Sequence, residues 1–228
     1  MSTPGPSSRK RARSGSQAGA RRRLNFGTSA GTRRPNISNN PVKVVSDVRR
    51  LKYVSYLSSA TAGVVQTLHL NSLYDPDNTG VGHQPLGFDQ ISLLYERYNV
   101  IGAQVRIHYT NRSSALLLVG SVSQSFSATA PTGVNNLAEE HSKRIVVVNP
   151  GRTGTLTTKF SSKLFFGVDD PYDEEFWPLI NSDPSHIAYC HITARDWEGT
   201  ATANDDFVVH FEIEFLAKFK DPKALTSS

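Results

Sequence analysis

A stretch near the end of the chain constrains the fold most strongly. From Phe207 to Phe219 every second residue is apolar, and polar residues such as His210, Glu212 and Glu214 stand between them. Successive side chains of a β-strand point to opposite faces, so this alternation predicts a strand with one buried and one exposed face. The body of the chain is therefore expected to be built on β-sheet.

Seven further segments have the composition or the alternation of strands. Residues Ala103 to Tyr109 alternate clearly. The short apolar runs Ala115 to Val119 and Ile145 to Val148 are typical of central strands that are buried on both faces. The remaining predicted strands cover residues 48–58, 64–71, 155–160 and 186–193, and a short additional strand at 42–45 is left open.

Two segments are predicted to be helical. In the first, apolar residues recur at helical spacing: Phe88, Ile91, Leu94, Tyr95 and Tyr98. Asp89 near its start is expected to act as the helix cap. A second short helical stretch is predicted over residues 172–179. Both are expected to be short elements in loops, the first packed on the sheet.

The lengths of the predicted connections alternate along the chain. Residues 59–63, 110–114 and 149–154 form short connections, whereas 72–97, 124–142 and 161–185 form long ones. In a jelly roll, every connection is expected to cross between two sheets, and alternate connections lie at opposite ends. We therefore predict an all-β fold, a single eight-stranded antiparallel jelly-roll sandwich over residues 41–220, with a short tail at 221–228.

The charge of the chain is concentrated in residues 1–40, which we call the arm. The arm holds nine basic and no acidic residues, which leaves 16 basic and 20 acidic residues for the rest. It is rich in Ser, Gly and Pro and has too few apolar residues to fold alone, so we predict disorder. Such an arm is expected to bind nucleic-acid phosphates, and its two basic clusters also fit a nuclear import signal. A solvated tail that merely aids solubility is the alternative. The basic residues are Arg9, Lys10, Arg11, Arg13, Arg21, Arg22, Arg23, Arg33 and Arg34.

The loop before the first predicted helix is distinctive. Residues 73–90 read LYDPDNTGVGHQPLGFDQ, and residues 94–100 read LYERYNV. With the Arg-rich arm and the eight strands, these segments resemble the capsid proteins of small circular single-stranded DNA viruses that encode a replication-initiator protein (CRESS-DNA viruses). The same jelly roll is shared with satellite necrosis viruses of plants and other small RNA viruses.

The resemblance implies a structural protein of the virion. It implies a jelly roll that assembles into a small icosahedral shell, T=1, of about 60 copies. The arm would lie inside the shell on a single-stranded genome, DNA rather than RNA. The nucleus of the host cell would be a second location, reached through a nuclear import receptor.

Six residues are candidates for contacts between subunits. His83 and Gln84 lie in the glycine-rich loop, for which a role in folding alone is the alternative. The other four are aromatic and too apolar to sit comfortably in water. They are expected either to pack against a neighbouring subunit or to fold back on their own sandwich. These four are Phe165, Phe166, Phe176 and Trp177.

Motifs for catalysis are missing from the sequence. It contains no Gly-Lys-Ser/Thr phosphate loop, no His-Glu-x-x-His, and no Gly-x-Ser-x-Gly elbow between a predicted strand and helix, because the one such pattern, at residues 27–31, lies in the arm. Seven histidines are scattered and Cys190 is the single cysteine, so no metal site or cofactor is predicted. Carboxylate pairs such as Asp75 and Asp77 supply too few of the oxygens that calcium needs, although bridging calcium is left open.

The sequence thus favours a non-enzymatic capsid protein with itself and nucleic acid as partners and no membrane partner. No run of apolar residues approaches the ~18 that a membrane helix needs. The alternative is a cellular jelly-roll module that binds nucleic acid or acts as an adaptor.

Overall fold

The computed structural model describes residues 46–59, 63–80, 82–131, 143–168, 173–197 and 207–224. The chain divides into two units, Met1–Pro41 and Val42–Ser228, and all of the described residues belong to the second. The predicted strand at 42–45 lies outside the described residues, as does the whole arm. Within the described part, no helix is long and apolar enough to cross a membrane.

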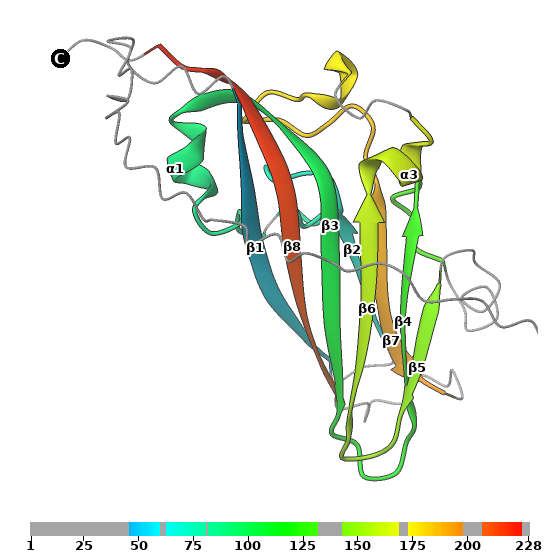
Figure 1. The fold of residues 1–228 in the computed structure, drawn as a ribbon. Helices are drawn as coiled ribbons and strands as arrows, with labels where there is room; N and C mark the ends of the chain where they lie inside the picture. Colours follow the sequence, from blue (N-terminus) through cyan, green and yellow to red (C-terminus); the bar gives the residue numbers. More distant parts are fainter. Residues whose placement is uncertain are drawn as a thin grey trace, which may run out of the picture. The chain divides into compact units, whose positions relative to one another are not determined.

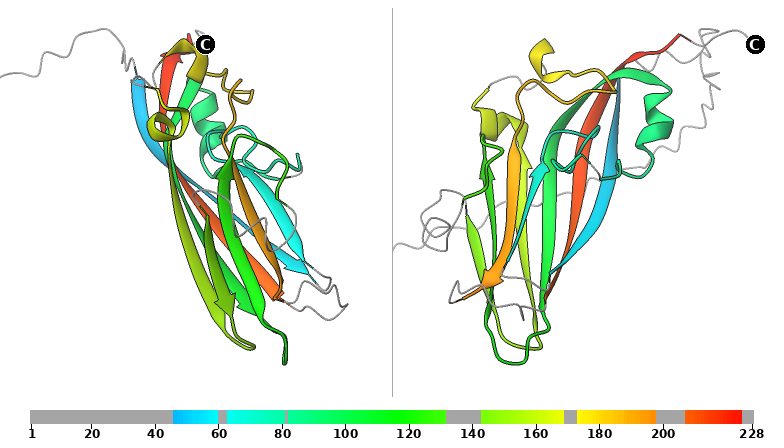
Figure 2. Two further views of the ribbon diagram at one scale, coloured as in Figure 1. Left: turned by 90° about the vertical axis from the view of Figure 1, so that its right-hand side faces the viewer. Right: turned by 180° about the vertical axis from the view of Figure 1, so that it is seen from behind.

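Eight strands form two antiparallel sheets that face each other (Figures 1 and 2). One sheet has the order β1-β8-β3-β6 and the other the order β2-β7-β4-β5. This strand order is that of a jelly roll, which confirms the predicted fold class. The strands are β1 (Ser46–Ser59), β2 (Val64–His69), β3 (Tyr95–Asn111), β4 (Leu118–Ser125), β5 (Arg144–Val148), β6 (Thr153–Ser161), β7 (Tyr189–Asp196) and β8 (Phe207–Pro222).

One premise of the topology prediction was wrong. We expected every connection to cross between the sheets, but β4 and β5 are hydrogen-bonded neighbours in the same sheet. The other six connections pass from one sheet to the other. A long connection is therefore compatible with a return to the same sheet as well as with a crossing.

Strand β8 supplies the centre of the core. It lies between β1 and β3, and its inward-facing aromatic side chains are fully buried: Phe207, Phe211, Phe215 and Phe219. Burying a side chain of this size stabilises the fold by about 1.5–3 kcal/mol. The alternation along this segment is confirmed, because the outward-facing residues His210 and Glu214 are exposed.

The two short apolar runs differ from the prediction. The strand predicted at Ala115 to Val119 begins only at Leu118 and runs to Ser125. Strand β5 is an edge strand rather than a central one, and Ile145 and Val147 are 44% and 47% exposed. An apolar run indicates a strand but not its place in the sheet, because that place depends on partners far away in the sequence.

The predicted helix after residue 87 is shorter than expected. Helix α1 covers Phe88–Ser92, and Tyr95 and Tyr98 belong to β3. The helical spacing therefore spans the junction of a helix and a strand. Gly87, with φ 87°, is the N-cap residue, and Asp89 lies in the first turn without capping the helix.

The second helical prediction is confirmed only in part. Within residues 172–179 the structure has a 3₁₀-helix, η1, over Glu174–Phe176. A further helix, α3 (Ser162–Phe166), directly follows β6 and was not predicted. It ends at Gly167, whose φ of 65° closes the helix.

Candidate functional site

His83 and Gln84 hold the glycine-rich loop onto the sandwich. The ring of His83 lies 4.5 Å from the ring of Tyr53, and its Nε2 is 3.0 Å from the main-chain oxygen of Val54. The side chain of Gln84 donates a hydrogen bond to the main-chain oxygen of Tyr74 at 3.1 Å. These contacts give both residues a role in folding. Their contact with a second subunit stays a prediction.

A buried carboxylate, Asp77, organises the same loop. Its Oδ1 accepts hydrogen bonds from Gln66 Nε2 at 2.5 Å and from the main-chain amide of Thr79 at 3.0 Å. A Cβ atom at Gly82 would lie 2.6 Å from the Cβ of Asp77, so only glycine fits there. The sequence showed the glycines and carboxylates of this loop but not the pairing of Gln66 with Asp77.

The four candidate aromatic residues pack on their own chain. The rings of Phe165 and Phe166 lie 5.5 and 6.3 Å from Phe160, and Phe166 lies 5.3 Å from Phe176. Phe176 and Trp177 are only 7% and 4% exposed. These contacts lie within the chain itself, and contact of the four residues with a neighbouring subunit stays a prediction.

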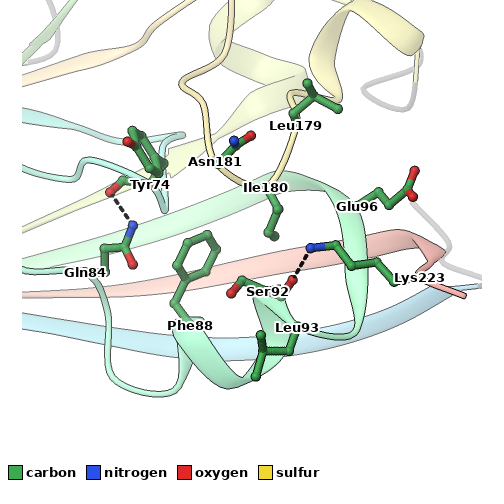
Figure 3. A pocket seen from close by; sticks show the side chains of 10 residues that line it. All are labelled: Tyr74, Gln84, Phe88, Ser92, Leu93, Glu96, Leu179, Ile180, Asn181 and Lys223. Carbon is green, nitrogen blue, oxygen red and sulfur yellow. Dashed lines mark hydrogen bonds between the residues drawn. The ribbon is translucent and has the colours of Figure 1, made fainter. Parts of the chain in front are cut away.

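A hollow of about 420 Å³ lies beside helix α1 (Figure 3). We call it the α1 hollow. Its lining mixes apolar and polar side chains, among them one acidic and one basic residue. Lys223 Nζ donates to the main-chain oxygen of Ser92 at 2.8 Å. The residues that line it include Tyr74, Phe88, Leu93, Glu96, Leu179 and Lys223.

The outward face of the sheet β1-β8-β3-β6 is rich in basic residues. Their strand register places them on the face opposite to the buried core, together with Glu212 and Glu214. Glu212 is shared by Lys52 and Arg106, and Glu214 pairs with Arg50. Basic side chains still outnumber the acidic ones on this face. They are Arg50, Lys52, Arg97, Arg106, Lys159, Lys218 and Lys220.

We expect Glu212→Gln to lower the melting temperature near pH 7 but to have little effect once the pH is low enough to protonate Glu212 in the folded protein. The hydrogen bond from Lys52, and then the charges of Lys52 and Arg106, lower the pKa of Glu212. A carboxylate with a lowered pKa stabilises the fold above its unfolded pKa and loses this contribution as the pH falls through its folded value. Thermal unfolding at several pH values measures the effect, which is expected to be about 1 kcal/mol or less.

Glu214→Gln is the matched control for this prediction. Glu214 also pairs with a cation, but its side chain is 49% exposed, against 17% for Glu212. Its ion pair with Arg50 is therefore screened by solvent and should contribute less. Equal losses for the two variants at neutral pH would contradict the role given to the shared carboxylate.

One group of potential metal ligands occurs among the described residues. Ligand atoms of His69, Asp75 and Asp183 all lie within 4.8 Å of one another. Nδ1 of His69 is 2.6 Å from the main-chain oxygen of Asp75, Nε2 is 3.0 Å from Asn78 Oδ1, and Ser72 Oγ donates to Asp183 at 2.5 Å. Burial raises the pKa of Asp75, and the charge of Asp183 adds to this effect. The hydrogen bonds explain the group as a structural tie between two loops.

The basic residues of the arm lie outside the described residues. Arg9 to Arg34, the predicted contacts to nucleic acid and to an import receptor, therefore stay predictions. The outward sheet face is the basic surface within the described ranges that sequence reasoning missed. The signal was present in the even positions of β8 and in Arg106, but their common face depends on the strand order.

The comparisons with known proteins give structural neighbours but no relatives in sequence. No protein-family model matches the chain, and no curated protein is significantly similar to it. A protein of Desmodium yellow mottle tymovirus has a TM-score of 0.46 at 11% identity, covering 82% of this chain and 95% of its own. The giant freshwater prawn (Macrobrachium rosenbergii) nodavirus particle gives 0.45 at 14% identity, covering 82% and 89%. The capsid protein of the BFDV 60-mer gives 0.44 at 10% identity, covering 80% and 97%. The jelly-roll assignment rests on the chain's own strand order.

Proposed function

We propose that this chain is a capsid protein that assembles into a closed icosahedral shell and packages single-stranded nucleic acid. One observation carries the proposal: a complete jelly roll is preceded by an arm with nine basic and no acidic residues. The sandwich supplies a folded domain against which further copies of the same chain can pack. The arm supplies the charge that a confined genome requires.

The arm is the main contact to the genome in this proposal. Arginine keeps its charge at all relevant pH values and pairs with phosphate through two parallel hydrogen bonds. Packaging would therefore depend on charge and would be largely indifferent to base sequence. The basic outward face of the sheet β1-β8-β3-β6 offers further contacts to phosphates of the nucleic acid.

The finer features of the proposal come from the resemblance of residues 73–100 to CRESS-DNA virus capsid proteins. They are a T=1 shell, a DNA genome, and entry into the host nucleus through the basic clusters of the arm. The competing proposal is a cellular jelly-roll module that binds nucleic acid without forming shells. It shares the sandwich and the arm, so only the assembly separates the two.

Imaging of the purified protein tests the proposal. We expect uniform closed particles by negative-stain electron microscopy, and an absorbance ratio at 260 and 280 nm that is characteristic of bound nucleic acid in the same fraction. Monomers or small oligomers, with and without added single-stranded DNA, would support the binding module instead. Supplying the DNA ensures that assembly is not missed because a genome is absent.

A further inference from the structure

We propose that the α1 hollow receives Leu164 of a second copy of this chain. Lys163 of that second copy would then form an ion pair with Glu96 of the first. This contact would be one of the lateral interfaces of the shell, and it rests on the proposed function. It joins two different surfaces of the same chain. Three features of the molecule support it: the open hollow, the exposed Leu164 with its neighbour Lys163, and the place of both surfaces in the fold.

The hollow combines exposed apolar side chains with polar ones and has no cover in the described part of the chain. Phe88 forms its floor, and Leu93 and Leu179 stand at its side, 74% and 51% exposed. Figure 3 shows Phe88 and Ile180 facing the space between α1 and the segment at residues 179–181, with Leu93 and Leu179 at its margins. Exposed apolar surface of this kind is typical of a contact site.

The walls of the hollow are held in place. Gln84 donates to the main-chain oxygen of Tyr74 on one side, and Lys223 donates to that of Ser92 on the other. The main-chain amide of Ile180 donates to the oxygen of Glu96 at 2.8 Å, which fixes the segment above α1. A preformed site loses less conformational entropy on binding than one that must first be ordered.

Helix α3 presents an exposed apolar side chain for this contact. Leu164 is 83% exposed, although both of the following phenylalanines are partly buried. Its helix is anchored from below, because the rings of Phe126 and Phe160 lie 4.4 and 5.5 Å from the ring of Phe165. Leu164 therefore projects from a rigid corner of the sandwich, which we call the α3 corner.

The charges beside the two surfaces are complementary. Lys163 precedes Leu164 and is exposed, and Glu96 is exposed at the rim of the α1 hollow. Within the described ranges, neither Lys163 nor Glu96 forms an ion pair with its own chain. Docking of Leu164 would bring Lys163 close to Glu96, whereas Lys223, the basic group of the hollow, is already held by its hydrogen bond to the main-chain oxygen of Ser92.

The two surfaces lie at opposite edges of one sheet. Helix α1 lies beside the edge strand β1, and α3 follows the other edge strand, β6 (Figure 1). Both are at the end of the sheet where β3 begins and β6 ends. One copy can therefore offer its α3 corner to the α1 hollow of the next, side by side. A contact between two different surfaces continues from copy to copy and closes into a ring when the rotation allows it.

Cysteine pairing tests the contact in the assembled protein. Leu93→Cys and Leu164→Cys are made separately and together, and oxidation is followed on non-reducing gels. We expect neither single variant to form dimers alone, a mixture of the two to form dimers only, and the double variant to form a ladder of multimers. The native Cys190 does not interfere, because it is fully buried and burial raises its pKa to about 12.

Controls keep this test separate from the test of assembly itself. Tyr56→Cys, an exposed residue on the outward sheet face, replaces Leu93→Cys as the matched control and should not pair with Leu164→Cys. Dimers from Leu93→Cys alone would show a contact between identical surfaces and would overturn the proposal. Closed particles without pairing in the mixture would also overturn it while leaving the capsid function intact. Absence of particles from the wild-type protein would instead remove the proposed function.

Discussion

Particles made from a variant with all nine basic residues of the arm replaced by glutamine are expected to contain almost no nucleic acid. Outside the arm the chain has both acidic and basic residues, whereas the arm has only basic ones. Removal of the nine charges leaves the rest of the chain with 16 basic and 20 acidic residues, a formal charge of −4. The absorbance ratio at 260 and 280 nm of purified particles should fall to that of protein alone, or shells should fail to form.

The salt dependence of binding gives this prediction a magnitude. Each phosphate contact to a single strand contributes a slope of about −0.7 to log K against log[salt]. Nine contacts give a slope of roughly −6, so a fourfold rise in salt lowers the affinity for single-stranded DNA by several thousandfold. The neutral variant should retain only the slope that the outward sheet face contributes. Fluorescence titrations at several salt concentrations measure both slopes.

A control separates charge from the other properties of the arm. In it, serines and threonines of residues 1–40 are replaced by glutamine, and all nine basic residues are kept. This variant should package nucleic acid like the wild type. Normal packaging by the neutral variant would contradict the role of the arm and transfer it to the outward sheet face.

The sequence predicted the fold best where local pattern and long-range partners agree. Strand β8 pairs with a neighbouring strand along each edge and turns one face to the core. Apolar and polar residues therefore alternate along its sequence. Strand β5 also looked like a central strand, yet it lies at an edge with Ile145 exposed. No local pattern distinguishes these two places, because an apolar side chain at an edge can serve a contact outside its own domain.

The candidate site could be predicted only in part for the same reason. The charge of the arm is a property of composition and needs no geometry. The α1 hollow, in contrast, combines residues as distant as Tyr74, Glu96, Leu179 and Lys223. The pairing of Gln66 with Asp77 likewise depends on how a loop returns to β2. Such juxtapositions follow from the strand order, which sequence patterns limit but do not determine.

Gly120→Val is expected to destabilise the sandwich strongly, and by more than the loss of the Glu212 ion pairs. Gly120 lies on β4 in one sheet, and the ring of Tyr109 lies on β3 in the other. A Cβ atom at position 120 would be only 2.6 Å from a ring carbon of Tyr109. The ring cannot move away easily, because Tyr109 is fully buried and its hydroxyl donates to the main-chain oxygen of Ser121 at 2.7 Å.

The bulk of valine must therefore push the two sheets apart. Overpacking of a core typically lowers the free energy of unfolding by about 1–3 kcal/mol. Because the ring is rigid, we expect a loss of about 3 kcal/mol for this variant. For a chain of this size the melting temperature should fall by roughly 6–12 °C. Thermal unfolding followed by circular dichroism measures the change. The milder variant Gly120→Ala, measured in the same way, gives a second melting temperature.

Two comparisons identify the ring as the cause. A Cβ atom at Gly154 would also meet atoms at 2.6 and 2.9 Å, but these are methyl carbons of Val148 and Val146 on the edge strand β5, which can shift more easily than a ring held between two sheets. Gly154→Val should therefore cost less than Gly120→Val. In a Tyr109→Leu background the cost of Gly120→Val should shrink, because the ring that it strikes is gone. Equal costs in both backgrounds would show that the sheets are separated by some other contact, since the double-mutant cycle would then report no coupling between positions 109 and 120.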